Sequence, residues 1–582
     1  MLTANNPAEF HDDTLHAFTL ERALSAALFA VALFVRLFYA GDAPLSNAEA
    51  RPALASWHFL QGIPDSFVGA PLLFAGNSIL FALFGASDTS ARFLPALFGA
   101  GLVLAPTLFR RELGNLGALI ASALLLFSPS LVLFSRTLDG ALPALASAML
   151  ALGFAWRYAN EGDARNANLA ALCAALALLA GRELWTILLT AAFLVAYSLR
   201  AKSLRFNRAD LTRAALLFGA TFVAIGTLFL IRVNGLGAAF DSLGRWFDFG
   251  ASAPLANPAG MLLLYEPLVV IFGVAGFFRF ARRSERDALL FVALAFGVGV
   301  TFLFYSFGIL REPAPIVNLV APLALFAGKW IADWIERVAA EYRAWGDEKF
   351  IPAPELPLWA FGSVLIIFLY LVIVEFITRG NVVALDVLAR GAEGNATGLF
   401  IVILALGAFG ALALLTIASV GTLRARNIGI ALALVWLCVW TARQSAMLNF
   451  LPPNVNEPLV ARAASPNVRD LERDLANMSR WRAGDSRTLN LRADESLGAI
   501  AEWTLRNYPR AQFVPRPSVE PETQALLLSP NAPAPGLDWI SQKYQLEISR
   551  SSPPPNLLRW LIFRDGGASN ATQAVLWMTQ PK

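Results

Sequence analysis

Residues 260–286 read GMLLLYEPLVVIFGVAGFFRFARRSER, an apolar run that ends in four arginines. A helix of about this length crosses the roughly 30 Å of hydrocarbon in a bilayer. Similar runs recur along the chain, in which hydrophobic residues make up 57% of the 582 residues and charged residues 15%, with a mean hydropathy of +0.56. The sequence therefore predicts a polytopic α-helical membrane protein.

About thirteen segments have the length and composition of a membrane span. They lie at 20–40, 92–109, 115–134, 140–157, 166–181, 183–199, 211–232, 260–280, 287–307, 313–332, 357–377, 397–420 and 427–448. A shorter apolar stretch, 71–85, contains Gly76, Asn77 and Ser78. We expect it to form an interfacial helix, within a region of such helices at residues 46–86.

Basic residues cluster after alternate spans, which predicts a cytoplasmic N-terminus and an external C-terminal domain. The clusters contain Arg110/Arg111, Arg157/Arg165, Arg200/Lys202/Arg205/Arg208, Arg279/Arg282/Arg283/Arg286, Arg337/Arg343/Lys349 and Arg424/Arg426. These arginines explain the formal charge of +4, which therefore gives no reason to expect nucleic-acid binding. The first 19 residues lack a positive n-region, so we expect the first span to be an uncleaved anchor in the cell membrane.

The composition changes at Leu451-Pro452-Pro453, after which no run is long enough to span a membrane. Residues 1–450 are thus predicted to form the transmembrane domain, and residues 451–582 a soluble external α/β domain large enough for its own core. Periodicity predicts helices at 468–482 and 497–507, and strands at 488–491, 512–514, 525–528, 545–548 and 557–563.

The first outer loop contains two candidate catalytic carboxylates, Asp42 and Glu49. A carboxylate held beside apolar walls is expected to have a raised pKa, which suits a general base. Ser46 and Glu49 also have the spacing of a capping box, so Glu49 alternatively only closes the start of a helix. We expect His58, on that same helix, to pack at the interface.

The second outer loop reads Ser135-Arg136-Thr137-Leu138-Asp139-Gly140. Asp139 stands where the fourth span begins, where it can cap the helix. The same position also lets it act as a second catalytic carboxylate or bind a divalent metal, Mg or Mn, with Glu49 as a further ligand. Arg136 is a candidate for binding a lipid phosphate.

Two further arginines lie at predicted outer ends of spans, Arg182 in Gly181-Arg182-Glu183 and Arg311 in Arg311-Glu312-Pro313. Ionisable residues so close to hydrocarbon need partners or must snorkel to the interface. Arginine also matches phosphate geometry, so both are candidates for holding a lipid phosphate. We find no GxGxxG, GxxxxGK or GxSxG motif and no Cys/His metal spacing, so nucleotide and hydrolase functions lack support.

Several segments together resemble the GT-C superfamily of polyprenyl-phosphate-dependent membrane glycosyltransferases. They are RLFYAGDAPLSNAEARPALASW, GAPLLFAGNSILFALFGASDTSARFLPALFGA and FSPSLVLFSRTLDGAL. More narrowly, further segments are similar to a prokaryotic subfamily of flippase-activity-associated proteins of surface glycosylation. These are LLLYEPLVVIFGVAGFFR, YSFGILREPAPIVNLVAPL, ASPNVRDLERDL, EWTLRNYP and LLRWLIFR.

The resemblance implies transfer of a sugar from a polyprenyl-phosphate carrier to an outward-facing acceptor, with Glu49 and Asp139 as the acids of the first and second loops. The sequence departs from the pattern in two places. The acidic pair of the first loop is Ala48-Glu49, and the Glu-Lys-x-Pro segment is Arg311-Glu312-Pro313. The missing acid at Ala48 bears directly on catalysis.

Three functions are compatible with the sequence. The first is a glycosyltransferase that uses a polyprenyl-phosphate-linked sugar, and the second is a non-catalytic flippase of lipid-linked oligosaccharides or its accessory subunit. The third is a structural membrane subunit that docks a protein partner through residues 451–582. All three require contact with membrane lipid.

Overall fold

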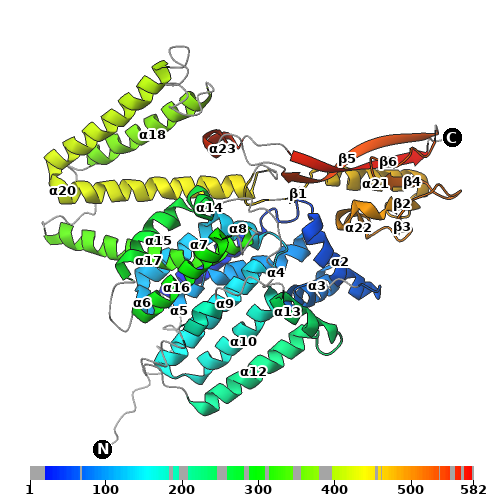
Figure 1. Ribbon diagram of the computed structural model, residues 1–582, viewed down its shortest axis with the longest axis horizontal. Helices are drawn as coiled ribbons and strands as arrows, with labels where there is room; N and C mark the ends of the chain where they lie inside the picture. Colours follow the sequence, from blue (N-terminus) through cyan, green and yellow to red (C-terminus); the bar gives the residue numbers. More distant parts are fainter. Residues whose placement is uncertain are drawn as a thin grey trace, which may run out of the picture.

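The computed structural model has a large bundle of helices, with a smaller sheet domain beside one end of the bundle (Figure 1). The chain ends in the sheet domain. The structure describes residues 20–65, 69–181, 188–193, 195, 207–244, 258–280, 288–307, 313–344, 356–378, 396–451, 457–460, 462–536, 538–550, 557–564 and 569–579.

Helices occur wherever a predicted span lies in the described part of the chain. Six of the described helices are long and apolar enough to cross a membrane, or eight when each sharply bent pair counts as one span. The expected total of about thirteen spans stays a prediction. The bundle contains α1 (Leu20–Leu37), α4 (Asp88–Leu102), α5 (Ala105–Leu108), α6 (Arg110–Leu113), α7 (Asn115–Phe127), α8 (Pro129–Ser135), α9 (Ala141–Glu161), α10 (Ala164–Ala180), α12 (Arg208–Gly226), α13 (Asn234–Gly244), α14 (Pro258–Tyr265), α15 (Pro267–Phe280), α16 (Ala288–Ser306), the 3₁₀ helix η4 (Ala314–Ile316), α17 (Val317–Ala344), α18 (Leu356–Thr378) and α20 (Ala396–Asn449).

The last two predicted spans, 397–420 and 427–448, both lie in α20. Its helical backbone breaks at Gly421, where φ is 85°. Glycine adopts this conformation without a steric penalty, which allows two helical segments to meet at a kink. Most of the predicted span at 183–199 lies outside the described residues.

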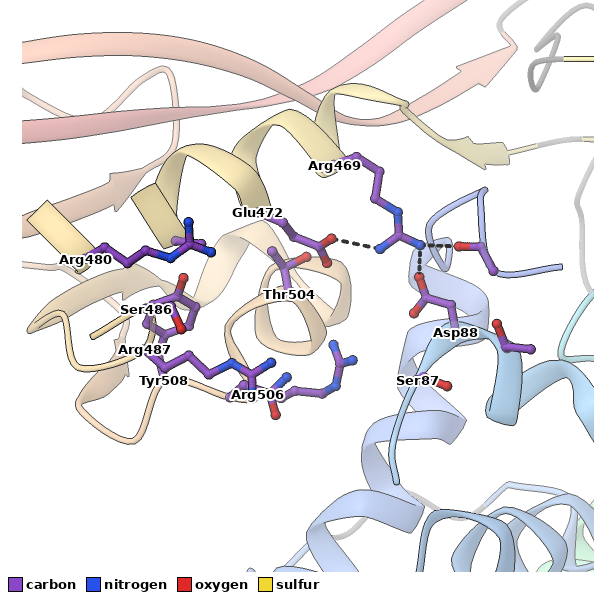
Figure 2. Close-up of a pocket in the computed structure, with 14 residues that line it drawn as sticks. Ser87, Asp88, Arg469, Glu472, Arg480, Ser486, Arg487, Thr504, Arg506 and Tyr508 are labelled. Atoms are coloured by element: carbon purple, nitrogen blue, oxygen red, sulfur yellow. Dashed lines mark hydrogen bonds and ion pairs between the residues drawn. The ribbon is translucent and has the colours of Figure 1, made fainter. Parts of the chain in front are cut away.

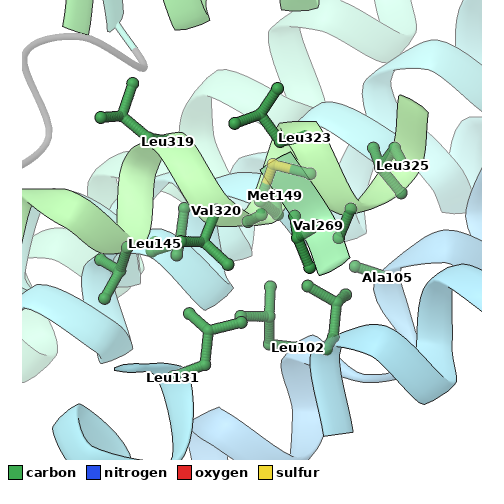
Figure 3. Packing of buried hydrophobic residues seen from close by; sticks show 14 of the residues in the cluster. Leu102, Ala105, Leu131, Leu145, Met149, Val269, Leu319, Val320, Leu323 and Leu325 are labelled. Atoms are coloured by element: carbon green, nitrogen blue, oxygen red, sulfur yellow. The ribbon is translucent and has the colours of Figure 1, made fainter. Parts of the chain in front are cut away.

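The centre of the bundle is a continuous apolar core around α17 (Figure 3). Leu319, Val320 and Leu323 of this helix pack with residues of α9 and α15, such as Met149 and Val269. Helix α15 crosses α17 closely: a Cβ at Gly276 would lie 2.5 Å from the carbonyl oxygen of Phe326. Small residues at such crossings let the backbones of membrane helices approach.

Two bent helix pairs meet inside the bundle. Helices α7 and α8 are bent by 60°, and α14 and α15 by 118°. Glu266, which is fully buried at the second bend, accepts hydrogen bonds from the Ser128 and Ser130 hydroxyls at the first bend, at 2.5 and 2.6 Å. A buried ionisable group in a membrane protein needs such partners, so this contact fixes the two bends against each other.

Two shorter helices, α2 (Asn47–Gln61) and α3 (Pro71–Phe84), lie between α1 and α4 in the chain. They form where interfacial helices are predicted. Helix α2 begins with the predicted capping box, in which Ser46 and Glu49 satisfy each other's backbone groups. It ends at Gly62, which is in the left-handed conformation.

The sheet domain contains six strands in the order β1-β5-β6-β4-β2-β3, with helices α21 (Asn467–Ala483) and α22 (Ala499–Leu505). Strand β2 pairs in parallel with β3 and β4, and the other pairs are antiparallel. The strands are β1 (Arg462–Ala464), β2 (Leu491–Asp494), β3 (Ala511–Val514), β4 (Ala525–Leu528), β5 (Trp539–Arg550) and β6 (Ser569–Thr579). The predicted α/β mixture is therefore present, with both predicted helices at the expected places.

The predicted strand at 557–563 is wrong, because these residues form helix α23 (Leu557–Phe563). Its Trp560 is fully buried in the core of the bundle, with its ring centroid 6.0 Å from that of Tyr265. A run of seven mostly apolar residues is too short for periodicity to distinguish strand from helix. Part of the chain after residue 451 thus packs against the membrane bundle.

Candidate functional site

A buried ion pair between Glu49 and Arg92 lies near the start of α4. The guanidinium of Arg92 donates to both carboxylate oxygens of Glu49, with Nε–Oε1 2.8 Å and Nη2–Oε2 2.9 Å. Arg92 also donates to the carbonyls of Ala40, Ala43 and Pro44. The pair therefore fixes the first outer loop onto the start of the second span.

The carboxylate of Glu49 accepts three more hydrogen bonds. Two come from the backbone and hydroxyl of Ser46, at 3.0 and 3.1 Å, and one from the backbone N–H of Leu138, at 3.0 Å. Burial raises the pKa of Glu49, but the charge of Arg92 and these hydrogen bonds outweigh it, so the net pKa lies below the usual value. The expectation of a raised pKa is wrong for Glu49, because its neighbour is a guanidinium.

The hydrogen bond from Leu138 brings the second outer loop to Glu49. Asp139 follows directly in the chain, is partly buried, and accepts a hydrogen bond from the N–H of Ala141 at 2.8 Å. It thus accepts from the first N–H of α9, whereas the N-cap residue itself is Gly140, one position later than the sequence predicted. The second loop thus joins the cluster of Glu49 and Arg92 through the backbone of Leu138, while the Asp139 carboxylate faces the start of α9.

Asp42 and Arg136 complete the cluster. Asp42 is exposed, and its charge acts on Arg136. Arg136 donates to the carbonyls of Val35, Arg36 and Phe38 at the end of α1. Burial, followed by the charge of Arg92, lowers the pKa of Arg136 to about 10. A partly desolvated cation of this kind can bind an anion strongly.

Ala48, where the resemblance leads us to expect an acid, is exposed on α2, next to the buried Glu49. Neighbouring positions on a helix point about 100° apart. The residue that faces solvent therefore carries no carboxylate, and the carboxylate that is present faces Arg92. The other two predicted phosphate ligands, Arg182 and Arg311, lie outside the described residues.

The residues of the cluster do not fit a divalent metal. Both oxygens of Glu49 accept hydrogen bonds, and the adjacent guanidinium would repel a cation. Within the described residues, His, Cys, Asp and Glu side chains form no group of three or more that could hold a metal ion. The predicted pair of ligands, Glu49 and Asp139, is thus not supported by its donor chemistry.

The sheet domain docks directly beside this cluster. Asp88, at the start of α4, accepts hydrogen bonds from Arg469 of α21 and from the indole of Trp503. Arg469 also donates to the carbonyls of Gly41 and Asp42. Neither Asp88 nor Arg92 was identified from the sequence. An arginine at the start of an apolar span does indicate a buried partner, so Arg92 could have been found.

Two further contacts hold the domain on α2. The carboxylate of Glu547 accepts from the backbone and side-chain nitrogens of Asn47, at 3.0 and 3.1 Å. His58 lies between Asp65, 2.8 Å from Nδ1, and Glu502, 3.2 Å from Nε2. Its hydrogen bond to Glu502 is the largest contribution to a raised pKa, which burial partly opposes. His58 thus contacts two carboxylates, which become ion pairs when the ring is protonated, in addition to the expected packing.

No family model and no curated protein matches the sequence. Among solved structures, ArnT from Cupriavidus metallidurans bound to undecaprenyl phosphate aligns with 96% of this chain and 99% of its own, with a TM-score of 0.54 at 13% identity. The chain has the fold of ArnT. A weaker match, with a TM-score of 0.48 at 13% identity, is archaeal oligosaccharyltransferase AglB from Archaeoglobus fulgidus in complex with an inhibitory peptide and a dolichol-phosphate, which covers 88% of this chain and 69% of AglB.

The ArnT fold and the apolar helices make this chain an integral membrane protein. The alignment with ArnT covers almost the whole chain, so the sheet domain belongs to the shared architecture. At 13% identity, the similarity to ArnT concerns the fold alone. The roles of the site residues therefore have to be argued from their contacts in this structure.

Proposed function

We propose that this protein transfers a sugar from a polyprenyl-phosphate carrier to an acceptor on the outer face of the membrane. The observation that carries the proposal is the meeting of the first and second outer loops at Glu49. Transfer is accelerated when carrier, acceptor and catalytic groups are held together in one geometry, and the meeting of these loops brings candidate groups from both to one place. The resemblance to GT-C glycosyltransferases and the fold shared with ArnT bound to undecaprenyl phosphate support the same function.

In this proposal Asp139 and Asp42 are the catalytic carboxylates, and Glu49 positions their loops. A general base must accept a proton from the acceptor hydroxyl. Glu49 is poorly suited to that step, because five hydrogen bonds occupy its oxygens and its pKa is lowered. Arg136, with Arg182 and Arg311, would stabilise the carrier phosphate as it leaves.

We further propose a cytoplasmic N-terminus and an external sheet domain, on the basis of the arginine clusters. A membrane-impermeant thiol reagent added to intact cells should label Ser541→Cys and spare Ser203→Cys. Labelling of Ser203→Cys alone would reverse the assignment.

The transfer reaction can be tested with labelled polyprenyl-phosphate-sugar and an envelope extract that contains acceptors. Wild-type protein in nanodiscs should move label from the lipid to the extract, and Asp139→Asn should lower the rate by about 10² to 10⁴. Arg111→Gln, at an exposed position in α6, is the control. Full activity in the Asp42→Asn, Asp139→Asn double variant would exclude these acids.

A second candidate function is the binding or movement of lipid-linked saccharides without catalysis. Two observations favour it: the exposed position next to Glu49 is an alanine, Ala48, and both carboxylate oxygens of Glu49 already accept hydrogen bonds. This protein would bind polyprenyl phosphate without transferring a sugar. Binding that depends on Arg136, with no transfer in any variant, would support it over the enzyme.

A further inference from the structure

A cavity of about 470 Å³ lies at the junction of the outer domain with the first outer loop and α4 (Figure 2). One wall comes from Gly41 and residues 87–89, and the other from α21 and the segments around residues 486–487 and 504–508. The segments ASPNVRDLERDL and EWTLRNYP therefore meet here. The cavity has the size of a small-molecule site.

Positive charge dominates the cavity. Four arginines line it, Arg469, Arg480, Arg487 and Arg506, against the two carboxylates of Asp88 and Glu472. Both carboxylates form ion pairs with Arg469. Among the described residues, the other three arginines have no carboxylate within ion-pair distance. The four arginines exceed the two carboxylates by two positive charges, and such an excess around one cavity attracts an anion.

Arg506 adds an unsatisfied donor. Its guanidinium lies over the ring of Trp503, 3.9 Å from the centroid, and donates to the carbonyls of Trp503 and Ala86. Its Nε is buried and has no hydrogen-bond partner in the described part of the chain. Buried donors are rarely left without an acceptor, so the guanidinium of Arg506 keeps part of its hydrogen-bonding capacity unused within the described residues.

The rest of the wall restricts the chemistry of that ligand. It contains Ser87, Thr89, Ser486, Thr504, Asn507 and Tyr508, and it contains no Leu, Ile, Val or Phe. The wall is mostly polar, so a polyprenyl chain would find little apolar surface here, whereas hydroxyls and amides suit a saccharide. Guanidinium groups bind phosphate oxygens through paired hydrogen bonds.

We propose that this cavity binds a phosphate or diphosphate group attached to a sugar. The group comes either from a soluble sugar phosphate or from the head group of a lipid-linked saccharide whose chain stays outside the cavity. The site does not depend on the proposed transfer reaction, and its residues are separate from Glu49, Asp139 and Arg136. A failed transferase assay would therefore leave the proposal intact.

The test is a calorimetric titration of the full chain in nanodiscs with pyrophosphate, glucose 1-phosphate and, as the neutral control, glucose. Pyrophosphate and glucose 1-phosphate should bind saturably, and glucose should not. The fluorescence of Trp503 should change on binding, since Arg506 lies on its ring. Undecaprenyl diphosphate in the nanodisc should displace the soluble ligand if the source is a lipid head group, and should leave it bound if the source is soluble.

Arg480→Gln and Arg487→Gln should each weaken binding about tenfold, the usual effect of losing one charge-assisted hydrogen bond. Both positions are exposed, so folding should be unaffected, which a thermal melt would check. Arg473→Gln is the matched control, because it removes the same charge from α21 outside the cavity. The absence of saturable phosphate binding, or an equal loss in Arg473→Gln, would overturn the site.

Discussion

Replacing Arg92 by methionine should destabilise the end of the membrane domain at which α2 and the start of α4 meet. The substitution keeps an unbranched apolar side chain but removes five hydrogen bonds, two to Glu49 and three to carbonyls of the first outer loop. Arg92 and Glu49 are 5% and 8% exposed, so the carboxylate would be left buried and unpaired.

Removing one partner of a buried ion pair typically costs about 3–5 kcal/mol. At roughly 2 °C per kcal/mol for a large domain, the apparent melting temperature should fall by roughly 6–10 °C. Glu49→Gln should cost less, because glutamine still accepts hydrogen bonds from Arg92. The Arg92→Met, Glu49→Gln double variant should recover about 1–3 kcal/mol relative to the sum of the single variants.

The assay is thermal unfolding of the four proteins in the same nanodiscs, followed by tryptophan fluorescence at one scan rate. Arg111→Met, at an exposed position, should melt like the wild type. A melting temperature of Arg92→Met within 1 °C of the wild type, on the scale of roughly 2 °C per kcal/mol, would refute the structural role of the pair. Strict additivity of the two substitutions would show that the side chains do not interact.

Three other predictions concern docking and catalysis. Asp88→Asn should weaken docking of the sheet domain by about 1.5–3 kcal/mol, because Asp88 accepts from both Arg469 and Trp503. Protease release of the domain should accelerate, whereas Asp470→Asn, at a half-exposed position, should not change it. The raised pKa of His58 means that its contacts with Glu502 and Asp65 stabilise docking below about pH 6.5 and lose that effect as the pH rises through the raised value; protease release should therefore be faster at pH 8 than at pH 6, and equal at both in His58→Gln. Ala48→Asp places a carboxylate on the exposed side of α2 and should raise transfer from labelled polyprenyl-phosphate-sugar, and an unchanged rate would show that this position is not part of the site.

The sequence predicted the elements far better than their partners. Apolar run length and capping patterns are local signals, so the helices of the bundle and the capping box at Ser46 could be located from the chain alone. The pairing of Glu49 with Arg92, 43 residues away, depends on how α1, α2 and α4 pack. For that reason the local environment of Glu49, and with it the direction of its pKa shift, was predicted incorrectly.

In the sheet domain, too, local signals were predictable from the sequence and tertiary contacts were not. Strand β4 coincides with its predicted range, because four consecutive apolar residues between polar loops are typical of a buried strand. Strand β6 was not predicted, since its first half, Ser569 to Gln573, is mostly polar and exposed. The sequence predicts a strand where helix α23 forms, because what stabilises the helix, the burial of Trp560 against Tyr265, is a tertiary contact.

Lipid analysis of the source cells would test the transferase most directly. Cells that lack this protein should accumulate a polyprenyl-phosphate-linked sugar, measured by mass spectrometry of lipid extracts, because the donor is no longer consumed. Wild-type protein should restore the normal level, and Asp139→Asn, present in the membrane at the same abundance, should not. Full restoration by the Asp42→Asn, Asp139→Asn double variant, or no accumulation in the deletion strain, would contradict the proposed reaction.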